Sequence, residues 1–123
     1  MSTILVADDD PRVRALVCEM LTRSGYRAQG TETGTQALAD MHRADLLLCD
    51  LVMPETDGLD VLRTARERTD APPIIIMSGS FDTLDALPEA ARLGAADALA
   101  KPFTAKTLIA RVRRALAADP RRD

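Results

Sequence analysis

Acidic, hydroxyl and amino side chains follow four short apolar runs of this sequence. In chain order these polar residues are Asp8 and Asp9, Asp50, Ser78, and Lys101. Three carboxylates brought together would repel one another, and the pKa of at least one would rise unless a cation lay nearby. Carboxylate oxygens suit Mg²⁺, whereas an ammonium and a hydroxyl suit the oxygens of a phosphoryl group. The pattern indicates metal-assisted phosphoryl chemistry.

These side chains meet only if the apolar runs are parallel strands of one sheet. The clearest run is 46–49, four apolar residues between Asp45 and Asp50, which is typical of a strand buried on both faces. The other expected strands are 3–7, 26–30 (the weakest), 74–77 and 96–100. Helical segments alternate with them, which predicts a doubly wound α/β fold. The carboxyl ends of its strands share one edge, where such sheets bind ligands.

Capping residues mark the expected helices. Asp10 before Pro11 predicts a helix start, and its apolar face would carry Val13, Leu16, Val17, Met20 and Leu21. Later caps are expected at Thr33 (with Gln36), Asp57 and Thr104, for helices of about 34–42, 58–68 and 105–118. The segment 83–93 contains Pro88, and a proline inside a helix costs about 3 kcal/mol. We therefore expect this helix to start near Leu87 or to kink, and to end at Gly94.

Composition limits the class of protein. The 123 residues are 46% hydrophobic and 28% charged, as in an ordinary globular domain, and we expect one domain over 1–123 with its core at about 3–118. The core must be aliphatic, because the aromatic residues are only Tyr26, Phe81 and Phe103. A net charge of −3 argues against a nucleic-acid surface, and the arginines near the C-terminus are expected to be solvated.

The cysteines, the single histidine and the N-terminus suggest no further chemistry. Cys18 and Cys49 have neither zinc-ligand nor disulfide-scaffold spacing, so we expect two buried thiols in a reduced cytosol. His42 is expected at the surface, not as a phosphodonor. The apolar run 3–7 is too short for the core of a signal peptide, and no apolar run approaches the ~18 residues of a membrane span. The sequence predicts a cytoplasmic protein without membrane contact.

Four segments, in this order, resemble the receiver domain of bacterial two-component response regulators, including the single-domain chemotaxis regulators. They are ILVADDDP at 4–11, LLLCDLVMPETDG at 46–58, IIIMSG at 74–79 and KPF at 101–103. The resemblance covers essentially the whole chain. It implies a flavodoxin-like (βα)5 fold with a five-stranded parallel sheet in the order 2-1-3-4-5.

The resemblance also implies roles for individual residues. Asp50 would be the phosphoacceptor, taking a phosphoryl group from a phosphohistidine on a sensor histidine kinase or a histidine phosphotransfer protein. Mg²⁺ or Mn²⁺ would be bound directly by Asp9, through water by Asp8, and also by Asp50 and the backbone carbonyl of Val52. Such a domain catalyses its own phosphorylation and dephosphorylation and is not an enzyme acting on a separate substrate.

Ser78 and Lys101 would contact the phosphoryl oxygens after the transfer, and the Lys101–Pro102 peptide bond is expected to be cis. Val52 and Ser80 flank the approach of an attacking water. The signal would reach a downstream effector protein through the face formed by the fourth helix, the fifth strand and the last helix, in a monomer or a phosphorylation-dependent dimer. That strand carries Ala98 where the family usually has an aromatic residue, so the signal would use another movement of the fourth helix.

Four alternatives remain beside this interpretation. In the first, the chain would be a degenerate receiver that docks without phosphorylation. In the second, it would be a receiver excised from a larger regulator or hybrid kinase, although Met1 and the arginine-rich end favour a stand-alone protein. A phosphohydrolase of the haloacid dehalogenase type is disfavoured because Val52 replaces its second acid. A flavodoxin-like cofactor binder is disfavoured because Asp8, Asp9 and Asp10 would repel a phosphate.

Overall fold

The structure is a computed structural model that describes residues 1–79 and 87–121. Its five strands are all parallel and lie in the order β2-β1-β3-β4-β5. Their bounds are β1 (Thr3–Ala7), β2 (Arg27–Thr31), β3 (Leu46–Asp50), β4 (Ile74–Ser78) and β5 (Asp97–Ala100). The predicted doubly wound fold and its strand order are confirmed.

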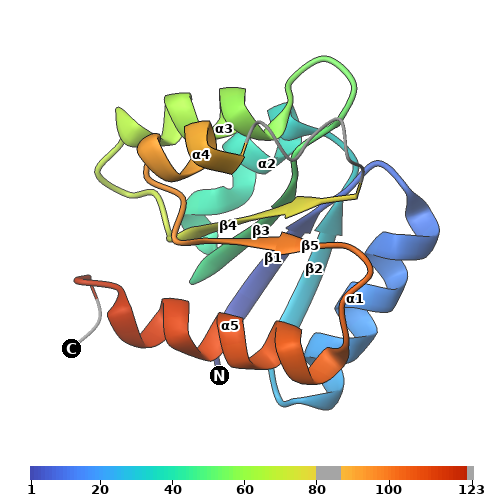
Figure 1. The fold of residues 1–123 in the computed structure, drawn as a ribbon. Coiled ribbons are helices and arrows are strands. Elements are labelled where there is room, and N and C mark those ends of the chain that lie inside the picture. Colours follow the sequence, from blue (N-terminus) through green and yellow to red (C-terminus); the bar gives the residue numbers. More distant parts are fainter. Residues whose placement is uncertain (80–86, 122–123) are drawn as a thin grey trace.

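Helices cover both faces of the sheet. Their bounds are α1 (Pro11–Arg23), α2 (Gly34–Asp40), α3 (Gly58–Arg66), α4 (Leu87–Arg92) and α5 (Ala105–Ala118), with a 3₁₀ turn η1 (Met41–Arg43) after α2. In Figure 1, α1 and α5 lie on one side of the sheet, and α2, α3 and α4 lie on the other. Each side has its own cluster of buried aliphatic residues, and β3 is buried along its full length between them.

The predicted helix caps are confirmed, except that the Gln36 side chain donates to Asp40 and does not complete a capping box with Thr33. The side chains of Asp10, Thr33, Asp57 and Thr104 each accept a hydrogen bond from a backbone N–H two or three residues later. These bonds satisfy N–H groups that the first turn of a helix leaves without partners. Asp10 and Asp57 cap the helices that follow β1 and β3, the two strands whose carboxyl ends carry the predicted acidic residues.

Several predicted boundaries and burials were wrong. β2 runs one residue later than predicted, α2 ends at Asp40 and gives way to η1, and α3 ends at Arg66. Leu16 is 53% exposed instead of buried, because Val17 and Leu21 already fill the contact between α1 and the sheet. Cys18 is only half-buried, since it lies at the margin of that contact.

Helix α4 has Pro88 as its second residue, a position where the missing N–H of proline removes no helical hydrogen bond. Gly94 follows the helix with a φ of 94°, as its predicted role as a terminator requires. The alternative of a kinked helix beginning near Thr83 involves residues 80–86, which lie outside the described residues, as do Ser80 and Phe81. Over 1–79 and 87–121, no helix is long and apolar enough to cross a membrane.

Candidate functional site

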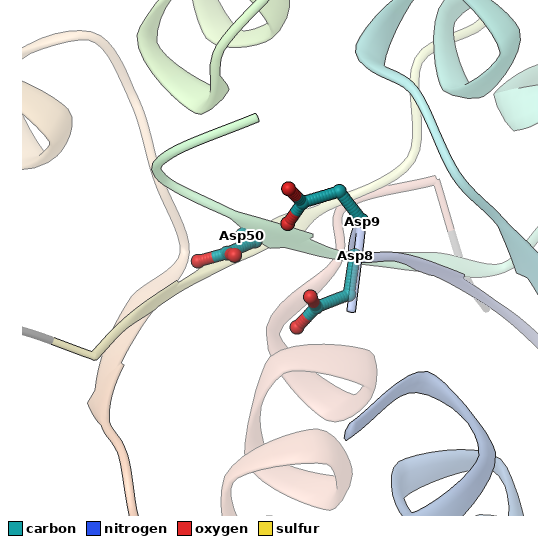
Figure 2. Close-up of side chains that lie close together, drawn as sticks. All are labelled: Asp8, Asp9 and Asp50. Carbon is teal, nitrogen blue, oxygen red and sulfur yellow. The ribbon is translucent and has the colours of Figure 1, made fainter. Parts of the chain in front are cut away.

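Three carboxylates meet at the carboxyl edge of the sheet. Asp8 and Asp9 directly follow β1, and Asp50 is the last residue of the neighbouring strand β3. One carboxylate oxygen from each lies within 4.8 Å of the others. Figure 2 shows the three carboxyl groups gathered at these two strand ends. The predicted convergence of these residues is therefore present.

Lys101 joins this group from the end of β5. Its ammonium lies 2.8 Å from Oδ2 of Asp8 and 3.4 Å from Oδ2 of Asp50. Asp8 is completely buried and Asp50 is 8% exposed, so water screens these contacts only weakly. The backbone N–H of Asp10 donates to Oδ1 of Asp8 at 3.0 Å. Lys101 thus bridges two carboxylates that would otherwise repel each other.

The electrostatics of the site raise two pKa values. Burial raises the pKa of Asp50, the Lys101 charge opposes this rise, and the negative charges of Asp8 and Asp9 add to it. Burial acts to lower the pKa of Lys101, but the hydrogen bond that its ammonium donates to Asp8 and the negative charges of Asp50 and Asp8 outweigh it and raise that pKa. The ammonium therefore stays charged at neutral pH, while Asp50 is less readily ionised than an ordinary aspartate.

An open depression of about 400 Å³ lies above these groups. It is lined by Asp8, Asp9, Asp10, Val13, Asp50, Val52, Gly79 and Lys101. Val52 is 59% exposed at its rim, two residues after Asp50. A small anion with a bound cation would have direct access to Asp50 through this depression.

Ser78 is placed differently from the other predicted site residues. It ends β4 and is 2% exposed, and it does not line the depression, whereas its neighbour Gly79 does. Its backbone carbonyl accepts a hydrogen bond of 2.7 Å from the N–H of Lys101. The Lys101–Pro102 peptide bond is cis, as predicted. The roles of Ser78 and of the Val52 carbonyl stay predictions.

The donor set fits a hard divalent cation. Asp8, Asp9 and Asp50 offer oxygen ligands only, which is the chemistry that Mg²⁺ and Mn²⁺ accept. Asp9 is exposed while Asp8 and Asp50 are buried, so a cation could keep water on its outer side. His42 is exposed on η1 and lies on the described surface away from this set.

Sequence reasoning missed one residue next to the site. Arg14, which is not among the apolar positions of the first helix, donates from Nη1 to the backbone carbonyl of Asp8 at 2.8 Å. Helical periodicity carries no signal for this contact, because it does not show which strand residue lies beneath the arginine. Cys49, which precedes Asp50, is completely buried, and burial is the main cause that raises the pKa of its thiol.

A larger hollow of about 590 Å³ lies at the opposite, amino edge of the sheet, between the loops before β4 and β5 and the end of α5. Its charged groups pair with one another. Asp97 pairs with Arg114, and Asp119 pairs with Arg121. Such matched pairs are typical of structural contacts, so the carboxyl edge is the better candidate for chemistry.

Comparison with known proteins agrees with this geometry. The family described as the response regulator receiver domain matches residues 4–113. Transcriptional regulatory protein CpxR of Klebsiella pneumoniae is 38% identical over 114 residues, covering 92% of this chain and 48% of that protein. Transcriptional regulatory protein ResD of Bacillus subtilis is 37% identical over 112 residues, covering 89% and 46%. The chain spans about half the length of these relatives.

Solved structures agree as well. A response regulator receiver domain protein from Clostridium thermocellum superposes with a TM-score of 0.88 at 27% identity, over 95% of each chain. The sequence match over most of the chain, the strand order and the acidic edge all indicate the same family. This chain belongs to the receiver domains of two-component response regulators.

Proposed function

We propose that this receiver is a phosphorylation-dependent switch whose acceptor is Asp50. A carboxylate oxygen of Asp50 attacks the phosphorus of a phosphohistidine on a histidine kinase or a histidine phosphotransfer protein. An O–P bond forms, the P–N bond breaks, and its electron pair stays on the imidazole nitrogen. The observation that carries this proposal is the meeting of Asp8, Asp9, Asp50 and Lys101 at one sheet edge.

Asp8, Asp9, Asp50 and the Val52 carbonyl are the groups that would hold Mg²⁺ or Mn²⁺. When bound, such a cation offsets the repulsion between an anionic acceptor and an anionic phosphoryl group. Asp50 must be ionised to attack, and burial opposes its ionisation. The charge of Lys101 acts in the opposite direction and favours the ionised form.

Lys101 and Ser78 would act on the transferred group. The ammonium lies 3.4 Å from Asp50 in the unmodified protein, so a modest shift brings it to a phosphoryl oxygen. Ser78 is buried beside Gly79 and would have to move toward the depression in order to donate its hydroxyl hydrogen. That movement would couple the state of Asp50 to β4 and to the segment that follows it.

The output would be a changed surface over α4, β5 and α5 for a downstream effector protein, in a cytoplasmic monomer or phosphorylation-dependent dimer. Residues 1–123 would form a single receiver unit for this purpose. Ala98, half-buried on β5, takes the place of the usual aromatic lever. We therefore assign transmission to movement of Ser78 and α4 and not to rotation of a ring.

Modification by a small phosphodonor such as acetyl phosphate tests this proposal. Intact mass would be measured on wild type and Asp50→Asn, each with Mg²⁺ and with EDTA. The expected result is a gain of one phosphoryl group only in wild type with Mg²⁺. Equal modification of Asp50→Asn would remove Asp50 as the acceptor. No modification of folded wild type would favour a degenerate receiver that docks without phosphorylation.

A further inference from the structure

We infer that Arg14 is a positioning residue of the acidic site. It would hold the backbone at Asp8, and thereby the direction of the Asp8 and Asp9 carboxylates, without touching the metal. This inference rests on the proposed Mg²⁺ site. It assigns a role to a residue that neither lines the depression nor contributes a ligand atom.

Arg14 completes the hydrogen bonding of β1 where its neighbour β2 ends. The N–H of Asp8 donates to the carbonyl of Thr31, the last residue of β2, at 3.1 Å. In a parallel ladder the carbonyl of Asp8 would next accept from the N–H of residue 33. The chain has turned away there, because Thr33 caps α2. Nη1 of Arg14 supplies the missing donor at 2.8 Å.

Gly30 makes room for this arginine. A Cβ built at Gly30 would lie 2.9 Å from Cδ and 3.0 Å from Cγ of Arg14, so that the arginine stem would have to shift. Gly30 is paired with Val6 on β1, one register step before the Ala7–Thr31 pair. Glycine is disfavoured inside a strand, and its presence there often marks a close approach by another group. The close approach here is the stem of Arg14.

The consequence is that every polar atom of Asp8 has a partner. Its N–H and carbonyl are bonded to Thr31 and Arg14, and its carboxylate oxygens are bonded to Asp10 and Lys101. The first two bonds hold the backbone, whereas the last two are made by the carboxylate oxygens themselves. Removing a group that positions a metal ligand without competing for its ligand atoms typically costs about 10- to 100-fold in metal affinity.

A matched control separates the positioning role of Arg14 from a general effect of its positive charge. Arg12 lies on the same helix, two residues earlier, and is exposed. Within 1–79 and 87–121 its side chain makes no hydrogen bond or ion pair, although its backbone N–H donates to the capping carboxylate of Asp10. Arg12→Met therefore removes the same charge from α1 and leaves the Asp8 carbonyl bonded.

The test is Mg²⁺ affinity by titration calorimetry, with thermal unfolding in EDTA to establish that each variant is folded. Arg14→Met is expected to weaken Mg²⁺ binding about tenfold. Arg12→Met is expected to change it by less than about twofold, because salt screens an exposed charge. Gly30→Ala should weaken binding in the same direction as Arg14→Met, since the new methyl group displaces the arginine stem.

A double-mutant cycle shows whether Gly30 acts through Arg14. In the Arg14→Ala background the stem is gone, so Gly30→Ala is expected to cause no further loss of Mg²⁺ affinity. An equal loss in both backgrounds, or equal affinities in Arg14→Met and Arg12→Met, would overturn the inference while wild-type binding stands. If Arg14→Met does not fold, Gly30→Ala decides the outcome. Folded wild type that binds no Mg²⁺ would overturn the proposed function and this inference together.

Discussion

The ammonium of Lys101 lies 2.8 Å from Oδ2 of Asp8, a residue 93 positions earlier in the chain. Two strands, β3 and β4, separate β1 from β5 in the sheet, so the lysine side chain reaches over the end of Asp50 to make this contact. The ion pair thus connects an inner strand to an edge strand across the site. A positive charge thus already offsets part of the repulsion between the carboxylates of Asp8 and Asp50.

Replacing Lys101 by methionine separates the effect of the lysine charge from the effect of a divalent cation. Lys101→Met is expected to destabilise the metal-free domain by about 3 kcal/mol at pH 7, because it leaves the buried Asp8 carboxylate without its cation. The pKa of Lys101 is raised in the folded state, so its contribution is present at pH 7 and is lost only as the pH rises through that value. Urea unfolding in EDTA measures the loss.

The same variant should bind Mg²⁺ more tightly than wild type, since no ammonium competes for the carboxylates. Mg²⁺ should therefore recover more stability in Lys101→Met than in wild type. Lys106→Met is the control, because Lys106 is exposed on α5. Weaker Mg²⁺ binding by Lys101→Met would show that the lysine organises the site instead of competing with the cation.

The ionised side chain of Asp50 is expected to lower the free energy of unfolding of the metal-free domain at neutral pH. Its pKa is raised above the ordinary value of 3.8, chiefly by burial. A raised carboxyl pKa means that the folded state favours the protonated form, and this contribution is lost as the pH rises through the folded pKa. Asp50→Asn should therefore stabilise the metal-free domain at pH 7, with a gain that fades as the pH falls toward 3.8.

Thermal unfolding of Asp50→Asn at pH 7 and pH 4, both in EDTA, measures this difference. Asp70→Asn serves as the control for removal of one negative charge, because Asp70 is exposed at the other edge of the sheet. An equal gain in stability of Asp50→Asn at both pH values would show that the gain does not come from removing a buried, ionised carboxylate.

Asp97 should have the opposite pH dependence. Burial acts to raise its pKa, but hydrogen bonds from Arg114, the Ala98 N–H and Arg111 outweigh it, so that the pKa is lowered. Asp97→Asn is expected to cost roughly 1 kcal/mol at pH 7, a modest value because Arg114 is largely exposed. The cost should disappear below pH 3.8, as the wild-type carboxyl is protonated through its lowered pKa.

Urea unfolding at pH 7 and at a pH below 3.8 would measure this change. Asp60→Asn breaks an exposed ion pair with Arg63 on α3 and should have a smaller effect at either pH. A pH-independent loss in Asp97→Asn would indicate that packing of the side chain, and not its charge, stabilises the start of β5.

Gly34 is a further position where a methyl group should be costly. A Cβ there would lie 2.2 Å from the backbone oxygen of Thr56, in the loop between Asp50 and α3. Gly34→Ala should therefore destabilise the domain by about 1 to 3 kcal/mol, although alanine favours a helix. Urea unfolding checks the loss. Gln36→Ala, at an exposed position of the same helix, should change stability far less.

Much of the site was predictable because its residues stand at the ends of apolar runs. Asp50 and Lys101 are identified by the strands before them, and the parallel arrangement follows from the alternation of strands and helices. Asp10, Thr33 and Asp57 were predictable caps, since a cap depends on residues two or three positions away. These features are local, so the sequence contains them directly.

The features that were missed depend on residues far apart in the chain. The contact of Arg14 with Asp8 requires Gly30, on another strand, to lie beneath the arginine. The exposure of Leu16 depends on how much of α1 the sheet and α5 can cover. Helical periodicity identifies the apolar face of a helix, but tertiary packing decides how much of that face is buried.

Because the Cys49 thiol is buried, its labelling can report when β3, the strand that carries Asp50, opens. The thiol is fully enclosed in β3 and its pKa is raised by burial, so a thiol reagent in solution reacts only with molecules in which β3 has separated from its neighbours. Cys18, half-buried on α1 at the margin of the core, is removed by Cys18→Ser, so that Cys49 is the remaining thiol. The labelling rate of the remaining cysteine then gives the free energy for opening β3 in the unmodified protein. Repeating the measurement with Mg²⁺ and after phosphorylation compares the free energy for opening β3 among these states.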